Sequence, residues 1–201
     1  QDDRVGVGQA LVAKLRRSLM DRDIPLWLDS PMQRLIKEGD RVVGAVVRHK
    51  GKDLRIRARK GVLMASGGFA KNLAMREKYQ FKPISTEWTA GSPDSKGDGI
   101  RIGKEAGAKL GFMHSVWWSP SYVLPDGRAI SIISGKSHPG SIMVGKSGKR
   151  FTNEAQPYEE FVKDQYAAND RGEGTIPCYL IFDAVFRHKY AIGHIRPGKI
   201  E

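Results

Sequence analysis

The chain has 201 residues and a net charge of +12, from 34 lysines and arginines against 22 acidic residues. This length suits one large domain or two small ones with a real hydrophobic core. No uncharged apolar run approaches about 18 residues, so no membrane span is expected, and the opening "QDDRVGVGQA" lacks the pattern of a signal peptide. Cys178 is the only cysteine, which excludes an internal disulfide or a CxxC motif and favours a reduced, cytoplasmic setting.

The first eighty residues predict a helix, several strands and a second helix. Leu11, Leu15 and Leu19 recur every four residues, which is the spacing of an amphipathic helix. Glycine-containing turns separate three apolar runs and so predict a strand meander. The expected elements are a helix over 8–20, a strand over 24–30, a three-stranded meander within 32–58, a buried strand over Val62–Ala65 and a helix over 73–80 capped by Asn72.

The rest of the chain predicts loops, helices and short strands. The helix expected after the loop has Gly103 and Gly107 in its interior, which costs stability unless something packs close to them. Gly111 is its expected C-terminal stop. The expected elements are a loop over 81–96, a helix over 97–111 that buries Ile100, Ala106 and Leu110, a change of domain near Trp118–Tyr122, a helix over 157–170 opened by Pro157, a buried strand over 176–183 and a short helix over 184–192.

The basic charge raises an alternative from another class, a nucleic-acid-binding domain. Arg55, Arg57 and Arg59 share one face of a predicted strand, with apolar residues on the other face. A solvated outer face of a sheet explains this pattern, and no zinc-finger spacing, RNP-type sequence or repeat supports the alternative. We therefore expect no nucleic-acid partner.

Several local motifs do not define a site. Gly6-Val7-Gly8 lacks the third glycine, the preceding strand and the βαβ unit of a dinucleotide fingerprint. Ser66 is not in a GxSxG elbow, and nothing nominates a base for it. The histidines show no i,i+4 pair and no cysteine company, so no metal site is predicted. They are His49, His114, His138, His188 and His194.

Aromatic residues at two places can each be interpreted as packing residues or as part of a site. Trp117 and Trp118 point to opposite faces if the chain is extended, so one ring is expected in the core and the other in the core or along a cleft. Tyr158 follows "RFTNEAQP" at the start of a predicted helix. Taken alone, it is more often a packing residue than a proton carrier.

Three segments, in this order, resemble one family of flavoenzymes. They are "VLMASGGFAKNLAMREKY", "GDGIRIGKEAGAKLGFM" and "GSIMVGKSGKRFTNEAQPY". With the meander "DSPMQRLIKEGDRVVGAVV", they are similar to the FAD-dependent fumarate reductase and 3-ketosteroid dehydrogenase superfamily over nearly the whole chain.

The resemblance implies an α+β fold in two parts. A partial FAD-binding domain of helices and a β-meander is expected over 1–118, and an α+β substrate (cap) domain over 119–201. The chain resembles an internal fragment without the N-terminal GxGxxG unit and the C-terminal return of the flavin domain. We therefore expect it to hold FAD poorly and to be inactive by itself.

The resemblance also assigns FAD-binding residues. Met32 matches a position whose backbone meets the adenine end of FAD. Ala65, Ser66, Gly67 and Gly68 match a turn, often Ala-Thr-Gly-Gly, that passes beside the cofactor, and serine keeps the hydroxyl group there. Gly97 and Asp98 match a Gly-Asp-Gly segment near the flavin.

Two positions favour the ketosteroid branch. Fumarate reductases have His-Pro-Thr where this chain has Ser119-Pro120-Ser121, and a proton-donating arginine five residues after the asparagine that matches Asn153, where this chain has Tyr158. Both changes remove groups that a doubly charged substrate needs, so a neutral hydrophobic ketone fits better. A tyrosine at this position is the feature of the 3-ketosteroid dehydrogenases.

The implied reaction is α,β-dehydrogenation of a 3-ketosteroid-like ketone. Tyr158 takes the α-proton, and the β-hydrogen leaves as hydride to FAD, while the external electron acceptor is undefined. A fumarate-reductase-like enzyme acting on another unsaturated acid is the alternative, with Arg150 binding the carboxylate. The candidate substrate contacts are Trp117, Trp118, Ser119 and Ile142.

Overall fold

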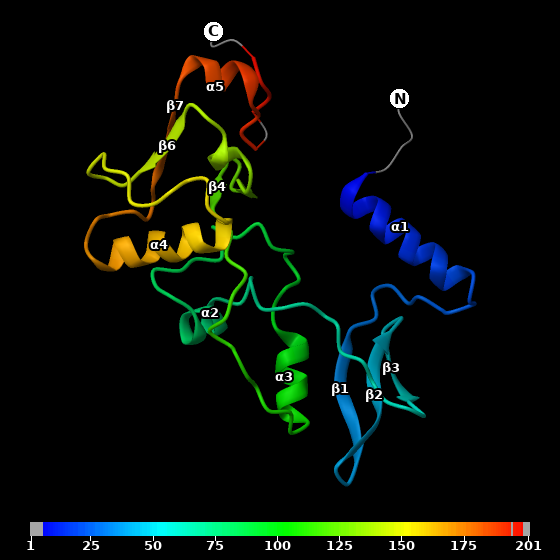
Figure 1. Ribbon diagram of the computed structural model, residues 1–201. Coiled ribbons are helices and arrows are strands. Elements are labelled where there is room, and N and C mark those ends of the chain that lie inside the picture. Colours follow the sequence, from blue (N-terminus) through cyan, green and yellow to red (C-terminus); the bar gives the residue numbers. More distant parts are fainter. Residues whose placement is uncertain (1–5, 194, 199–201) are drawn as a thin grey trace. The chain divides into compact units, whose positions relative to one another are not determined.

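The computed structural model describes residues 6–193 and 195–198. The chain divides into two compact units, Gln1–Met64 and Ala65–Glu201. Together they contain helices and small antiparallel sheets, consistent with the predicted α+β class (Figure 1). This division falls at a different place from the predicted boundary between 118 and 119, which concerns the flavin and cap domains and stays a prediction.

The first unit combines one helix with the predicted meander. Strands β1, β2 and β3 form an antiparallel sheet in the order β1-β2-β3, and the middle of β2 is buried at Ala45 and Val46. Helix α1 follows the predicted range, but Leu11 and Leu15 of its apolar stripe are more than half exposed. The bounds are α1 (Val7–Met20), β1 (Met32–Glu38), β2 (Arg41–His49) and β3 (Lys52–Arg57).

Two strands predicted near the meander are wrong. Residues 24–30 have no regular secondary structure, and their contacts to β2 are made by side chains instead of backbone hydrogen bonds. The Trp27 ring stacks on His49 with 4.6 Å between the ring centroids, and Ser30 Oγ lies 2.7 Å from Nδ1 of the same histidine. Val62–Ala65 has no regular secondary structure and pairs with no strand of the described residues, and Leu63 is 92% exposed. An apolar run becomes a strand only where a neighbouring strand accepts its hydrogen bonds.

The second unit contains the remaining elements. Helix α2 is capped as predicted, since Asn72 Oδ1 accepts the Met75 N–H at 3.0 Å, and the predicted loop over 81–96 carries no helix or strand. Strands pair antiparallel as β4–β5 and β6–β7. The bounds are α2 (Leu73–Tyr79), α3 (Asp98–Glu105), β4 (Ser121–Val123), β5 (Ala129–Ser131), η1 (Gly135–Ser137), β6 (Ser141–Val144), α4 (Tyr158–Asp170), β7 (Tyr179–Phe182) and α5 (Ala184–Lys189).

Helix α3 is shorter than predicted. Gly107 adopts φ +98°, and the Ala108 N–H donates to the Gly103 carbonyl at 2.9 Å, the arrangement of a Schellman C-cap. The helix therefore ends before Gly111, the predicted stop. Its buried residue is Ile102, whereas Leu110 lies beyond the helix and is exposed. Of the three residues predicted to be buried, Ile100 and Ala106 are half-buried and Leu110 is exposed, so the predicted buried face is wrong.

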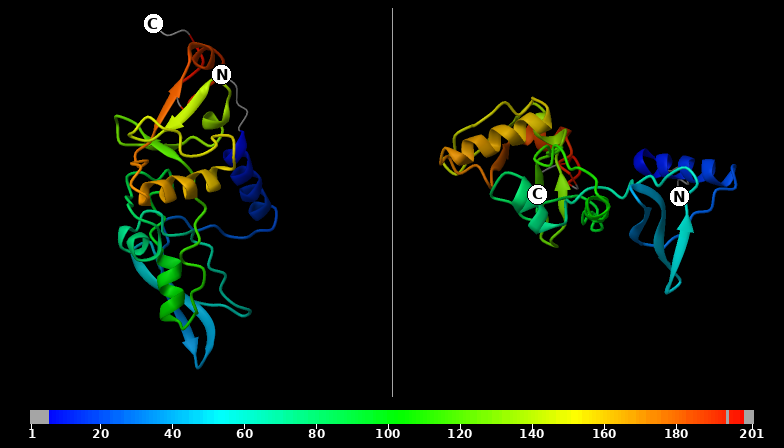
Figure 2. Two further views of the ribbon diagram at one scale, coloured as in Figure 1. Left: turned by 60° about the vertical axis from the view of Figure 1, so that its left-hand side comes forward. Right: turned by 90° about the horizontal axis from the view of Figure 1, so that it is seen from below.

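The core of the second unit lies under α4. This helix lies beside the β6–β7 pair (Figures 1 and 2) and contributes Phe161, Val162 and Tyr166 to the cluster. Strand β7 covers only Tyr179–Phe182 of the predicted 176–183, and three of its four residues are exposed, so the prediction of a buried strand is wrong. A two-stranded sheet covered by one helix leaves its other face open. The other buried members of the cluster are Trp118, Ile132 and Met143.

Two glycines of the α3 region predict opposite changes in stability. Gly103→Ala puts a methyl group in a helix where the nearest atom is 3.8 Å away, so we expect a gain of about 0.5–1 kcal/mol. Gly97→Ala forces alanine to φ +82° and brings its Cβ to 3.0 Å from Phe69 Cβ, so a loss of more than about 1 kcal/mol is expected. Urea unfolding of both variants measures the difference, and equal midpoints would contradict the α3 geometry.

Candidate functional site

The Ser66-Gly67-Gly68 turn presents bare backbone to one side. Its residues are exposed, Gly67 has φ +78°, and a Cβ added at Gly68 would meet no heavy atom within 4 Å. On the other side, the Gly97 N–H donates to the Gly68 carbonyl at 3.0 Å. The structure therefore joins the two predicted cofactor segments of the second unit, 65–68 and 97–98. Met32, the remaining predicted contact, is the first residue of β1 in the first unit.

A cavity of about 940 Å³ adjoins this turn within the second unit. Gly68 lines it together with Trp117, Trp118 and Ser119, so predicted cofactor and substrate residues share one cavity. Ile142 and Tyr158 are not part of its lining. The walls are mostly apolar and aromatic, as is common for sites that bind small organic ligands. Burial raises the pKa of the lining Cys178 thiol to about 11, so this group is a neutral part of the wall.

The two tryptophans have different environments. The Trp118 ring is 8% exposed and lies 5.2 Å from the Tyr166 ring and 6.1 Å from the Phe81 ring. The neighbouring Trp117 is 81% exposed and lines the cavity. One ring thus belongs to the core, and the other is available to a ligand.

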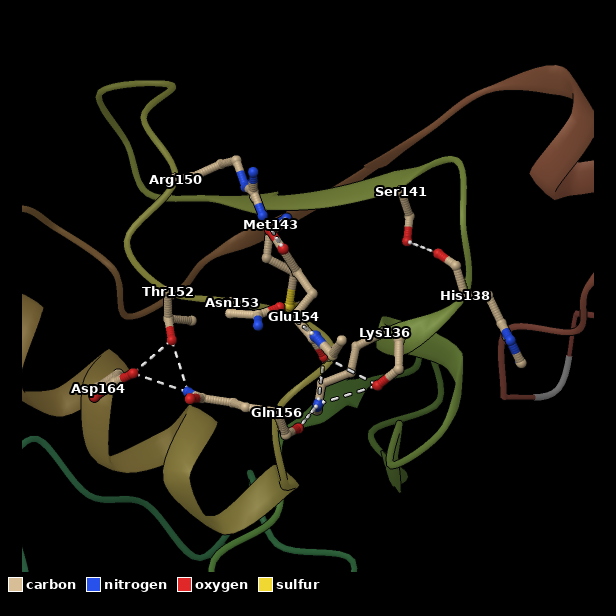
Figure 3. Close-up of polar contacts among 12 residues, drawn as sticks. Lys136, His138, Ser141, Met143, Arg150, Thr152, Asn153, Glu154, Gln156 and Asp164 are labelled. Atoms are coloured by element: carbon tan, nitrogen blue, oxygen red, sulfur yellow. Dashed lines mark hydrogen bonds and ion pairs between the residues drawn. The ribbon is translucent and has the colours of Figure 1, made fainter.

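Tyr158 is the first residue of α4, and a buried lysine fixes the segment that leads to it. The Lys136 side chain is 1% exposed, and its Nζ donates to the Glu154 carbonyl at 2.6 Å and to the Gln156 carbonyl at 2.7 Å (Figure 3). Burial lowers the pKa of Lys136, which the charge of Glu154 partly offsets. The backbone two residues before Tyr158 is therefore held from the side of η1.

The Glu154 carboxylate completes this network. It accepts the Met143 N–H at 2.8 Å and two hydrogen bonds from the Arg150 guanidinium, at 3.1 and 2.5 Å. Burial raises the pKa of Glu154, but the hydrogen bonds from Arg150 and Met143 outweigh burial and hold it below the ordinary value. Because Arg150 is already bound to Glu154, it is poorly placed to bind a substrate carboxylate, as the fumarate-reductase-like alternative requires.

A second set of contacts fastens the same segment to α4. The Asp164 carboxylate accepts hydrogen bonds from Thr152 Oγ1 at 2.5 Å and from Gln156 Nε2 at 2.8 Å (Figure 3). These bonds lower the pKa of Asp164, with Thr152 the larger cause. Residues 152–156 have no regular secondary structure, so their conformation depends on such side-chain contacts.

The sequence interpretation missed three residues that the structure places at or near this site. Lys136 is buried, and Arg76 and Tyr166 line the cavity. No local pattern distinguishes Lys136 in "SGKSHPG" or Arg76 in "LAMREKY" from an exposed cation. Their burial results from tertiary packing and carries no signal in sequence periodicity.

Neither a cluster of metal ligands nor a membrane-spanning helix occurs among the described residues. Within 6–193 and 195–198, no three histidine, cysteine or acidic side chains gather as metal ligands. His194 lies outside the described residues. No helix in this part of the chain has the length and apolar character needed to cross a membrane.

Comparison with known proteins supports the predicted resemblance. Residues 1–191 match the FAD binding domain family. The 3-oxosteroid 1-dehydrogenase of Mycolicibacterium smegmatis is 42% identical over 97% of this chain and 36% of its own length. That of Comamonas testosteroni is 31% identical over 98% of this chain and 35% of its own. The chain thus spans about a third of the length of these relatives.

A solved structure shares the fold. The crystal structure of 3-ketosteroid delta1-dehydrogenase from Sterolibacterium denitrificans, in complex with 1,4-androstadiene-3,17-dione, matches 96% of this chain and 35% of its own, with a TM-score of 0.91 and 41% identity. The predicted resemblance to the ketosteroid branch is confirmed.

Replacing the buried Lys136 should cause a large loss of stability. Lys136→Met keeps the length of the side chain but deprives two carbonyl oxygens of their donor, so unfolding should become easier by about 1–3 kcal/mol. Lys163→Met is the control, because Lys163 is an exposed lysine whose partners are the half-buried Glu159 and the exposed Glu160. Thermal unfolding of both variants measures the effect, and similar melting temperatures would contradict the role of Lys136.

Proposed function

Because the chain belongs to the FAD binding domain family, we propose that it forms part of a flavoenzyme that dehydrogenates a 3-ketosteroid-like hydrophobic ketone. The observation that carries this proposal is the apolar cavity beside the open Gly68 backbone, in a chain 42% identical to a 3-oxosteroid 1-dehydrogenase. A neutral ring compound suits walls of this composition.

The residues of the second unit fit FAD. The open side of Gly68 admits a flat ring system against the backbone, and the hydrogen bond from Gly97 fixes that backbone from behind. In this proposal Ala65–Gly68, Gly97 and Asp98 hold the flavin part, and Met32 meets the adenine end. When bound, FAD supplies the acceptor for a hydride.

Tyr158 is the proposed base. Its deprotonated phenolate oxygen takes the proton next to the ketone carbonyl and so becomes the hydroxyl, and the network of Lys136 and Glu154 supports this role by fixing the start of α4. A base must lie within hydrogen-bond reach of the proton that it takes, so the position of α4 matters directly. Trp117, Trp118, Ser119 and Ile142 are the proposed substrate contacts.

Flavin reduction tests the reaction. In the protein that carries this sequence, anaerobic addition of a 3-ketosteroid should bleach the flavin absorbance, whereas fumarate should not reoxidise the reduced flavin at a comparable rate. Rapid reoxidation by fumarate without bleaching by ketosteroids would overturn the proposed function.

Removing the Tyr158 hydroxyl should slow dehydrogenation. We expect Tyr158→Phe to lower kcat for a 3-ketosteroid by roughly 10²- to 10⁴-fold, the usual contribution of general-base catalysis. The flavin content should stay unchanged, because Tyr158 is not among the proposed FAD contacts. Tyr190→Phe, which removes a hydroxyl from a ring stacked on His138, is the matched control. Full turnover by Tyr158→Phe would eliminate this tyrosine as the base.

The lack of a side chain at Gly68 should be needed for tight FAD binding but not for the stability of the fold. Gly68→Ala meets no protein atom within 4 Å, so its melting temperature should match that of the unchanged protein. A methyl group between backbone and cofactor costs about 1–3 kcal/mol, which is roughly a 5- to 150-fold increase in the Kd for FAD. Flavin fluorescence titration of the apoprotein measures the Kd, with Gly103→Ala as the control. An unchanged Kd would show that FAD does not approach this turn.

A further inference from the structure

One cation stands in the otherwise uncharged wall of the cavity. Among the described residues that line it, Arg76 is the only one with a charged side chain, and the others are apolar, aromatic or neutral polar. This arginine comes from α2 and is 8% exposed, so its charge is held away from bulk water.

The protein engages Arg76 only with neutral oxygen atoms. Its Nε donates to Gln80 Oε1 at 2.9 Å, and its Nη1 donates to the carbonyls of Ser85 at 2.7 Å and Ala70 at 3.4 Å. No carboxylate of the described residues forms an ion pair with it. Nη2 makes no hydrogen bond within the described chain. Every fully buried polar side-chain atom there has a hydrogen-bond partner, so Nη2 is not fully buried and is accessible.

Such an arrangement favours an anionic ligand. A buried charge without a counter-charge is costly, and a guanidinium with free N–H groups binds a carboxylate through charge-assisted hydrogen bonds. Burial also lowers the pKa of Arg76, and the interaction with Tyr166 offsets this only in part. Lys136, the other buried cation, differs because its Nζ is fully engaged and the carboxylate of Glu154 acts on it.

We propose that the cavity binds an apolar ring ketone that also carries a carboxylate, and that Arg76 binds this carboxylate. The ketone part rests on the proposed function, whereas the carboxylate part rests on Arg76 alone. A single carboxylate remote from the reacting carbonyl agrees with the absence of a cation at Ser119 and Tyr158. The substrate is then a keto monoacid, in contrast to the dicarboxylates of fumarate reductases.

A matched pair of ligands tests this proposal in the unchanged holoprotein. Calorimetric titration at neutral pH compares a 3-oxo-4-androstene 17-carboxylate with its methyl ester. A charge-assisted contact predicts that the acid binds roughly 10- to 100-fold more tightly than the ester. Arg76→Gln should abolish the difference, while Arg171→Gln, which removes an exposed arginine at the end of α4, should keep it.

The outcomes separate the two proposals. Equal binding of acid and ester, with normal flavin bleaching by neutral ketosteroids, overturns the role of Arg76 and leaves the dehydrogenase intact. A loss of FAD from Arg76→Gln, with acid and ester bound equally by the unchanged protein, assigns the arginine to a cofactor phosphate and overturns the substrate proposal. If Arg76→Gln does not fold, the acid-to-ester ratio of the unchanged protein decides. If neither ligand binds and no ketosteroid bleaches the flavin, both proposals fail.

Discussion

The conformation of the segment that leads into α4 depends on one buried ammonium group. Desolvating a lysine costs several kcal/mol unless hydrogen bonds replace the lost water. Lys136 obtains them from the carbonyls of Glu154 and Gln156, in a stretch with no helix or strand. The side chain of Glu154 then binds the backbone of β6 at Met143. Lys136 and Glu154 therefore tie η1, β6 and the segment before α4 together, and they fix the backbone that leads to Tyr158.

Lys136 and Arg76 show two uses of the same chemistry. Both are buried cations that donate to backbone carbonyls. The ammonium of Lys136 has its hydrogen bonds satisfied and a carboxylate close enough to act on its pKa, so it is structural. Arg76 has neither, and it lines a cavity. A guanidinium can fix a loop through Nε and Nη1 and still offer Nη2, because its five N–H groups point in different directions.

The sequence predicted the elements that local pattern determines. Leucine spacing located α1, turn glycines located the meander, and Asn72 and Pro157 located the starts of α2 and α4. It failed where the outcome depends on distant partners. Residues 24–30 and Val62–Ala65 have strand-like composition but no ladder partner in the described chain. Of the candidate site, the turn at Gly68 and the wall at Trp117–Ser119 were predicted through the resemblance, whereas Arg76 and Lys136 depend on burial that no pattern encodes.

The cavity is lined by backbone on one segment and by side chains on others. At Gly68 the wall is backbone, and its shape depends on the absence of a side chain and on the hydrogen bond from Gly97. Other parts of the wall consist of side chains from other segments. They are Arg76 on α2, and Trp117 and Ser119 before β4. A substitution on those segments changes charge or volume in the cavity. In the proposed function, this arrangement lets the redox group stay fixed while substrate preference follows from a single charge, and Arg76 is the residue where that preference should be measured first.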